Sequence, residues 1–164
     1  MPATAAASDG VPYDFSCSLG APIVIHGHAP ATVRGGETFA VTDVFLQYTN
    51  PNGPVSYTGP RVTIPAPPGA TGSHLVIEIP QTVTLDPGET FVSPPIAGSF
   101  VASGQAGTAI EFRPTTLTQD SASTGGGGPL DCIFRDGPAF ATTTVVANVS
   151  VEPEPVTAAP RFTG

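Results

Sequence analysis

Prolines and glycines interrupt this chain so often that a helical fold is excluded. The 164 residues include 20 Pro and 19 Gly. Proline removes a backbone donor and clashes with the preceding helical turn, so it breaks or kinks a helix. Nearly every span of a dozen residues contains such a break, and no window carries an amphipathic helix. The chain can therefore fold only from short extended segments.

The segments between the breaks alternate with a period of two residues, as strands do. In 141–151 one set of alternate residues is mostly apolar and the other mostly polar, which predicts a strand with one exposed face. In 39–48 both sets are largely apolar, which predicts a strand covered on both faces. Further strands are expected at 11–19, 21–28, 55–58, 61–65, 73–79, 89–93, 96–102, 108–113 and 130–135.

Turn sequences separate these segments and complete the prediction of the fold. Asn52-Gly53-Pro54, Pro67-Pro68-Gly69 and Asp86-Pro87-Gly88 supply the fixed φ of proline and the positive φ of glycine. About 8–10 short strands with frequent turns predict an all-β fold, an antiparallel Ig-like β-sandwich of the Greek-key type. We expect a flexible N-terminal arm at 1–10, a single sandwich domain at 11–151 and a Pro-rich tail at 152–164.

One sequence pattern occurs twice within the predicted domain. Residues 30–39 and 80–91 both read Pro-x-Thr-Val, a short spacer, and then Gly-Glu-Thr-Phe. Each copy predicts a strand end, a tight turn and a new strand that enters the core through its Phe. The pattern has two explanations: an internal duplication, or repeated use of one solution that packed sheets require.

The charge balance excludes two classes of partner. Five Arg, no Lys and 13 acidic residues give a net charge of −8. Nucleic-acid binding requires a basic surface, which five scattered arginines cannot form. No run approaches the 18 or so apolar residues of a spanning helix, so we expect no membrane insertion. Residues 1–10 lack the features of an intact signal peptide, which suits a mature secreted chain or a protein made without a signal.

The two cysteines predict a disulfide. Cys17 and Cys132 lie in alternating, strand-like runs near the two ends of the predicted domain. A bond between them would tie the first strand to a late one, as in many exported domains. The alternative is a pair of buried free thiols that behave as small apolar residues. Their spacing excludes a redox CxxC motif and a zinc site.

No other pattern predicts catalysis or a cofactor. His26 and His28 share one face of a strand and could meet a metal with His74. The alternative, which we favour, places them on the exposed side of an edge strand whose other face holds Ile23 and Ile25. No Gly-x-Ser-x-Gly elbow is present. The acidic residues Asp86, Glu89 and Asp136 fall in turns, where bonds to the backbone explain them. We therefore expect a protein that is not an enzyme and holds no metal or cofactor.

Several motifs in order resemble a known family. They are Tyr13-Asp14-Phe15-Ser16-Cys17, the segment Ala29-Pro30 to Phe39, Ile79 to Val83, Gly88 to Phe91, Gly98-Ser99-Phe100, Gly107 to Ile110 and Asp131-Cys132. This order resembles an uncharacterised actinobacterial family of exported Ig-like β-sandwich proteins, whose members are sometimes labelled "dehydratase" without biochemical support. The resemblance covers about residues 11–135 and implies an exported or cell-envelope domain with an early and a late Cys in a disulfide.

Taken together, these observations predict a non-enzymatic, secreted or cell-surface protein. It would act by binding a protein partner or a surface, or by self-association through edge strands and termini. The alternative is a structural subunit of a larger assembly, such as a virion decoration protein or a surface filament subunit that uses strand exchange. In that alternative the strand at 141–151 could complete a neighbour's sheet.

Overall fold

A computed structural model describes residues 10–16, 21–122, 130–134 and 137–148. These residues form sixteen strands, and no helix among them could span a bilayer. The predicted arm and tail at 1–10 and 152–164 lie outside the described residues, apart from Gly10. The strands are β1 (Val11–Tyr13), β2 (Ile23–His28), β3 (Thr32–Arg34), β4 (Thr38–Thr49), β5 (Val55–Thr58), β6 (Arg61–Ile64), β7 (Ala70–Gly72), β8 (Leu75–Glu78), β9 (Val83–Leu85), β10 (Thr90–Val92), β11 (Ile96–Ala102), β12 (Ala109–Phe112), β13 (Thr116–Gln119), β14 (Ser121–Ala122), β15 (Leu130–Ile133) and β16 (Ala141–Val146).

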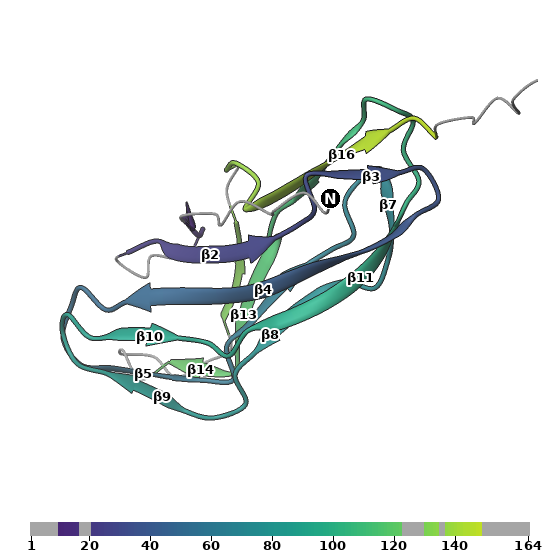
Figure 1. Ribbon diagram of the computed structural model, residues 1–164. Helices are drawn as coiled ribbons and strands as arrows, with labels where there is room; N and C mark the ends of the chain where they lie inside the picture. Colours follow the sequence, from purple (N-terminus) through teal and green to yellow (C-terminus); the bar gives the residue numbers. More distant parts are fainter. Residues whose placement is uncertain (1–9, 17–20, 123–129, 135–136, 149–164) are drawn as a thin grey trace, which may run out of the picture.

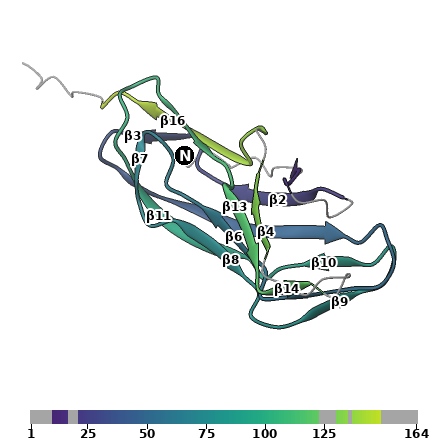
Figure 2. The ribbon, with the colours of Figure 1, turned by 180° about the vertical axis from the view of Figure 1, so that it is seen from behind.

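The strands form two packed layers, so the predicted all-β sandwich is confirmed. One layer is the sheet β1-β2-β4-β11-β7, in which β10 also pairs with β4. The facing layer contains the sheet β15-β13-β6-β8, with β12-β16-β3 and β14-β5-β9 as two smaller sheets. In Figures 1 and 2, β13 runs across the direction of β4. One pair departs from the predicted antiparallel pattern, because β16 and β3 run parallel.

The number of strands exceeds the predicted eight to ten because several short strands were missed, whereas prolines separate neighbouring strands largely as predicted. Pro60 separates β5 from β6, Pro114 separates β12 from β13, and Pro94-Pro95 separates β10 from β11. Five strands were not predicted: β3, β7, β9, β13 and β14. Each has only two to four residues, too few to show a period. The strand predicted at 141–151 ends at Val146 as β16; residues 147 and 148 are not in a strand, and 149–151 lie outside the described residues.

The prediction that 39–48 is covered on both faces was wrong, and a β-bulge is the reason. Phe39 and Val41 are buried before the bulge, whereas Val44, Leu46 and Tyr48 are buried after it. One extra residue in β4 shifts its register against both β2 and β11. Because side chains alternate between faces, one extra residue moves the buried set from odd to even positions. Both sets are therefore apolar although only one face of the strand is buried.

Asp43 lies in the bulge and has a positive φ of 52°. This left-handed conformation is tolerated by Asn and Asp and is strongly disfavoured for β-branched residues. We expect Asp43→Val to lower the free energy of unfolding by about 1–2 kcal/mol. Asp43→Asn is the matched control and should stay within about 0.5 kcal/mol of the wild type. Urea titration measures both, and equal losses would mean that the charge of Asp43, not its backbone, matters.

The two copies of the repeated pattern fold into the same structure. In each, a strand in the second layer ends, a tight turn follows, and a new strand starts in the first layer: β3 leads to β4, and β9 leads to β10. The φ angles are 81° at Gly36 and 83° at Gly88. Glu37 Oε2 accepts the N–H of Arg34 at 2.7 Å, and Glu89 Oε2 accepts that of Asp86 at 2.9 Å. We call these structures the first and second arch.

The two arches differ in how well their Phe is covered. Phe39 of the first arch is 6% exposed and contacts the rings of Phe100 and Phe112, whose centroids lie 6.0 and 6.2 Å away. Phe91 of the second arch is only half-buried. The core is thus closed by aromatic rings beside the first arch and left more open beside the second. This open region is the candidate site.

Candidate functional site

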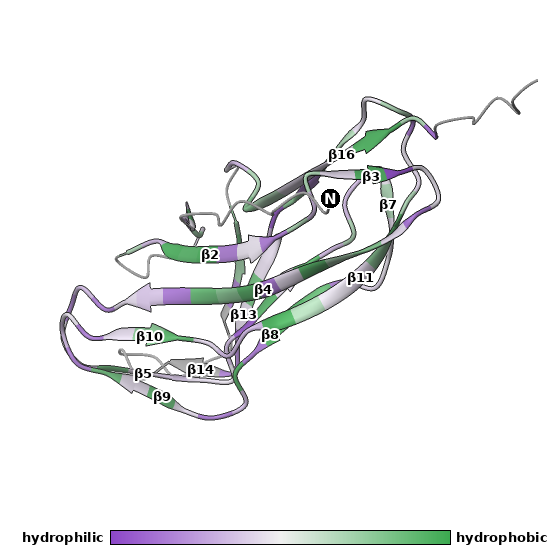
Figure 3. Ribbon diagram, in the orientation of Figure 1, coloured by the Kyte–Doolittle hydropathy of each residue, from purple (hydrophilic) through white to green (hydrophobic). Residues whose placement is uncertain are grey.

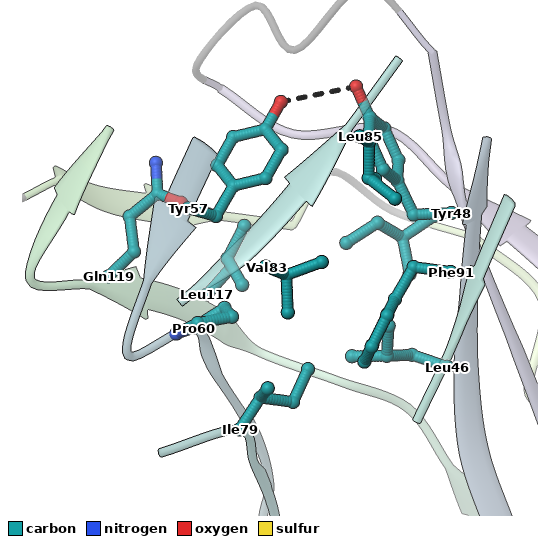
Figure 4. A pocket seen from close by; sticks show the side chains of 11 residues that line it. Leu46, Tyr48, Tyr57, Pro60, Ile79, Val83, Leu85, Phe91, Leu117 and Gln119 are labelled. Atoms are coloured by element: carbon teal, nitrogen blue, oxygen red, sulfur yellow. Dashed lines mark hydrogen bonds between the residues drawn. The ribbon is translucent and has the colours of Figure 1, made fainter. Parts of the chain in front are cut away.

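An apolar hollow lies between the two layers beside the second arch (Figure 4). Its free space is about 440 Å³ when its open mouth is included. The first layer contributes residues from β2, β4 and β10, and the second contributes residues from β5, β9 and β13 and the segments that flank β6 and β8. The lining residues are Ile23, Leu46, Tyr48, Tyr57, Pro60, Ile79, Val83, Leu85, Phe91, Leu117 and Gln119.

Three polar side chains line this otherwise apolar hollow. The hydroxyls of Tyr48 and Tyr57 lie 3.3 Å apart, and the two rings pack edge to face. Gln119 is 3% exposed, and its Nε2 is buried without a hydrogen-bond partner. Buried amide groups are nearly always paired, because an unpaired one costs about 1–3 kcal/mol. Gln119 therefore leaves an unused donor at the Tyr57 side of the hollow (Figure 4).

Burial of the tyrosines gives the fold a predictable sensitivity to alkali. Burial raises the pKa of Tyr57 well above its ordinary value of 10.0, and the hydrogen bond to Tyr48 raises it further. Burial also raises the pKa of Tyr13 to about 12. Both groups must stay protonated in the folded state, whereas in the unfolded chain they ionise near pH 10. Their contribution to stability is therefore complete below about pH 10 and is lost as the pH rises above it.

We expect the free energy of unfolding to fall between about pH 10 and pH 12, and Tyr57→Phe to reduce that fall. Urea unfolding at fixed pH values measures both slopes. The phenylalanine variant keeps the ring and removes only the ionisable hydroxyl. Equal slopes for the wild type and Tyr57→Phe would contradict the assignment to Tyr57.

The size of the hollow can be tested by filling it. Val83 lies near its centre in Figure 4 and is only partly buried. Val83→Ile adds one methylene, and burying it should raise the free energy of unfolding by about 0.8 kcal/mol. Val62→Ile is the matched control, because Val62 is fully buried in β6 and overpacking there should cost about 1 kcal/mol or more. Thermal and urea unfolding show whether each variant raises or lowers the free energy of unfolding. Destabilisation by Val83→Ile would mean that the hollow cannot take another carbon atom.

The predicted disulfide falls partly outside the described residues. Cys17 is not among them, so the bond to Cys132 stays a prediction. Cys132 is 1% exposed, and no described cysteine is a free thiol. The neighbouring residues pair antiparallel: Phe15 forms a bridge with Phe134, and Ser16 N donates to Ile133 O at 3.0 Å.

The histidines lie where the alternation predicted, but their strand is not an edge strand. β2 lies between β1 and β4. Figure 3 shows it changing from hydrophobic to hydrophilic toward its histidine end. His26 stacks on Phe45 with centroids 4.4 Å apart, and its Nε2 is buried without a partner. His28 Nδ1 lies 3.6 Å from Asp43 Oδ2. His74 lies in the exposed segment before β8, and no group of three metal-ligating side chains occurs among the described residues.

Among the acidic residues singled out in turns, the predicted bond to the backbone is confirmed for Glu89. Glu89 accepts a backbone N–H within the second arch, as predicted, and Asp86 lies in the same turn. Asp136 lies outside the described residues. Ion pairs join Arg61 to Glu78 and Arg113 to Glu111 on the surface, where they are exposed. None of these carboxylates lines the hollow.

Comparisons with known proteins bear on the fold. No family model matches the chain, and no curated protein does. Five chains of solved structures match. One is the crystal structure of a "putative membrane anchored protein" from Corynebacterium diphtheriae, with 17% sequence identity and a TM-score of 0.51. The match covers 88% of this chain and 38% of that one, so this chain spans well under half the length of its structural neighbour. At this identity the likeness shows the fold alone.

The sequence did not predict the hollow. Its lining residues come from separate strands whose pairing no local pattern reveals, and Tyr48 and Tyr57 were assigned only to the core. The repeated pattern was the available signal. It marked two equivalent positions in the fold. The first arch is closed because two further aromatic rings pack against its Phe39, whereas Phe91 of the second arch is only half-buried.

Proposed function

We propose that this chain is a non-enzymatic module of an exported cell-envelope protein and that it acts by binding a protein partner. The observation that carries the proposal is the apolar hollow at the second arch. It is concave, mostly apolar and supplied with a few polar groups, as binding sites are. The tyrosine pair and the Gln119 amide can bind and orient a ligand, but they form no arrangement of nucleophile, base and orienting group.

Three further features support the placement in the envelope. The structural neighbour in Corynebacterium diphtheriae bears the name of a membrane-anchored protein. The sequence resembles the exported Ig-like family of actinobacteria, which agrees with the proposed location in the cell envelope. Cys132 is buried and is not a free thiol, which suits a disulfide, a bond that forms in oxidising compartments. The acidic, lysine-free composition also suits an exported chain and a partner that is neither nucleic acid nor an anionic membrane.

The alternative of a structural subunit loses its main support. The segment expected to complete a neighbour's sheet is β16, and 141–146 already lie between β12 and β3 of the same chain. Other strands of the described residues still have a free edge, so self-association through them has to be tested. Light scattering of the purified chain should give a monomer. A discrete larger assembly, such as a ring or a filament, would favour the structural subunit instead.

Protease treatment of intact cells tests the placement. The complete gene product that contains this chain would be expressed in its own host with an epitope tag beside the domain. We expect added proteinase K to remove the tag from intact cells while a cytoplasmic control protein survives. Protection of the tag until the cells are lysed would overturn the proposal of an envelope protein.

A further inference from the structure

Two strands with a free edge contribute to the wall of the hollow. β9 is the last strand of β14-β5-β9, and β10 pairs only with β4 among the described residues. The two strands belong to opposite layers and are joined by the turn of the second arch, as Figure 1 shows. Val83 and Leu85 of β9 and Phe91 of β10 line the hollow. A segment that approached these edges would therefore reach the hollow directly.

The edge of β10 presents unused backbone groups. Hydrogen bonds join β10 and its flanks to β4 at Glu89 and at Ser93. Because antiparallel bonds use every second residue, Phe91 also bonds toward β4, and Thr90 and Val92 direct their N–H and C=O groups away from it. Val92 is 52% exposed, a large apolar side chain on an open edge. An added antiparallel strand could pair with these two residues.

Such a strand would place one side chain over the hollow. The residue opposite Phe91 would form a pair without hydrogen bonds, in which side chains of the two strands lie closest. It would point to the same face as Phe91, which is the face that lines the hollow.

The charges around the mouth indicate the chemistry of the partner. Asp86 and Glu89 are exposed in the turn that joins the two edges, and Asp120 is exposed just after Gln119. The nearby cation, Arg61, is paired with Glu78. The rim is therefore negative. It favours lysine or arginine beside the apolar residue and disfavours acidic peptides and fatty-acid carboxylates.

We propose that the free edge of β10 and the apolar hollow bind an extended peptide of a partner protein, by strand addition, with one apolar side chain in the hollow and basic residues beside it. This proposal rests on the proposed function as a binding module and names its partner's chemistry. Strand addition obtains affinity from main-chain hydrogen bonds and specificity from pockets for alternate side chains.

Peptide selection tests the proposal with this chain as the target. A random seven-residue library on phage would be selected on the wild type, and enriched peptides would be synthesised and titrated by fluorescence anisotropy. We expect them to share one apolar residue flanked at alternate positions by Lys or Arg. Val83→Phe, which fills the hollow, should weaken them at least about tenfold. Val146→Phe is the matched control at an exposed position of β16 and should leave binding unchanged.

Two further comparisons keep the test independent of one variant. Glu89→Gln should weaken basic peptides about threefold or more, whereas Glu37→Gln, its equivalent in the first arch, should not. Methylation of the peptide nitrogens that would bond to β10 should abolish binding, because it removes the donors of the added strand. No enrichment over background, or equal binding to Val83→Phe and to methylated peptides, would overturn the proposal. The envelope location is tested separately on intact cells, so either idea can fail alone.

Discussion

Replacing Phe112 by alanine is expected to lower the free energy of unfolding by about 3–5 kcal/mol. Phe112 is fully buried. Its ring centroid lies 4.8 Å from that of Phe100, 6.2 Å from that of Phe39 and 6.5 Å from that of Phe140. The substitution removes the ring that contacts the other three. The free energy of unfolding falls for two reasons: less apolar surface is buried, and the packed sheets cannot close the cavity that remains.

Phe91→Ala is the matched control for this prediction. Phe91 is half-buried and lines the open hollow, so its removal should cost less than half as much as that of Phe112. Urea unfolding of both variants measures the ratio. Equal losses would mean that the second arch is packed as tightly as the first, and the hollow would no longer be a credible binding site.

Removing the predicted disulfide is expected to cost about 4 kcal/mol. A bond between Cys17 and Cys132 would close a loop of 115 residues, and the chain-entropy model assigns about 4–5 kcal/mol to loops of this length. We expect the wild type in the presence of a strong reductant to lose most of this stability. The double variant Cys17→Ala/Cys132→Ala should lose somewhat more, because Cys132 is also buried and alanine leaves a small cavity.

Thiol counting provides the control for the disulfide. The unreduced protein, unfolded in guanidinium, should show no reactive thiol, and the reduced protein should show two. Two reactive thiols before reduction would contradict the bond and would also weaken the proposal of an exported protein. Stability measured with and without reductant then isolates the cross-link from the effects of substitution.

Much of the fold could be predicted from alternation and turn residues, because both act over a few residues. The bounds of β5 and β11 agree with the sequence analysis. Pairing could not be predicted, because it depends on contacts between residues far apart in the chain. The parallel pairing of β3 with β16 and the approach of Tyr48 to Tyr57 both arise in this way.

The candidate site was harder to predict than the fold for a related reason. Sequence analysis can recognise residues that carry chemistry, such as His26, His28 or the cysteines. The hollow is made instead by common core residues and by incomplete packing around them. Gln119 was the one unusual residue, but an amide in a short polar segment gains meaning only when its burial and its unused donor are known.

The bulge at Asp43 restricts how the length of this chain can change. Removing Thr42 or Asp43 would close the bulge and leave Val44, Leu46 and Tyr48 on the buried face, but removing one residue after the bulge, such as Phe45, would turn Leu46 and Tyr48 toward solvent. The hollow would lose two of its walls in the same step. Insertions and deletions can therefore accumulate in surface loops, whereas the distance along the chain from Val44 to Tyr48 must stay constant for the binding end to exist.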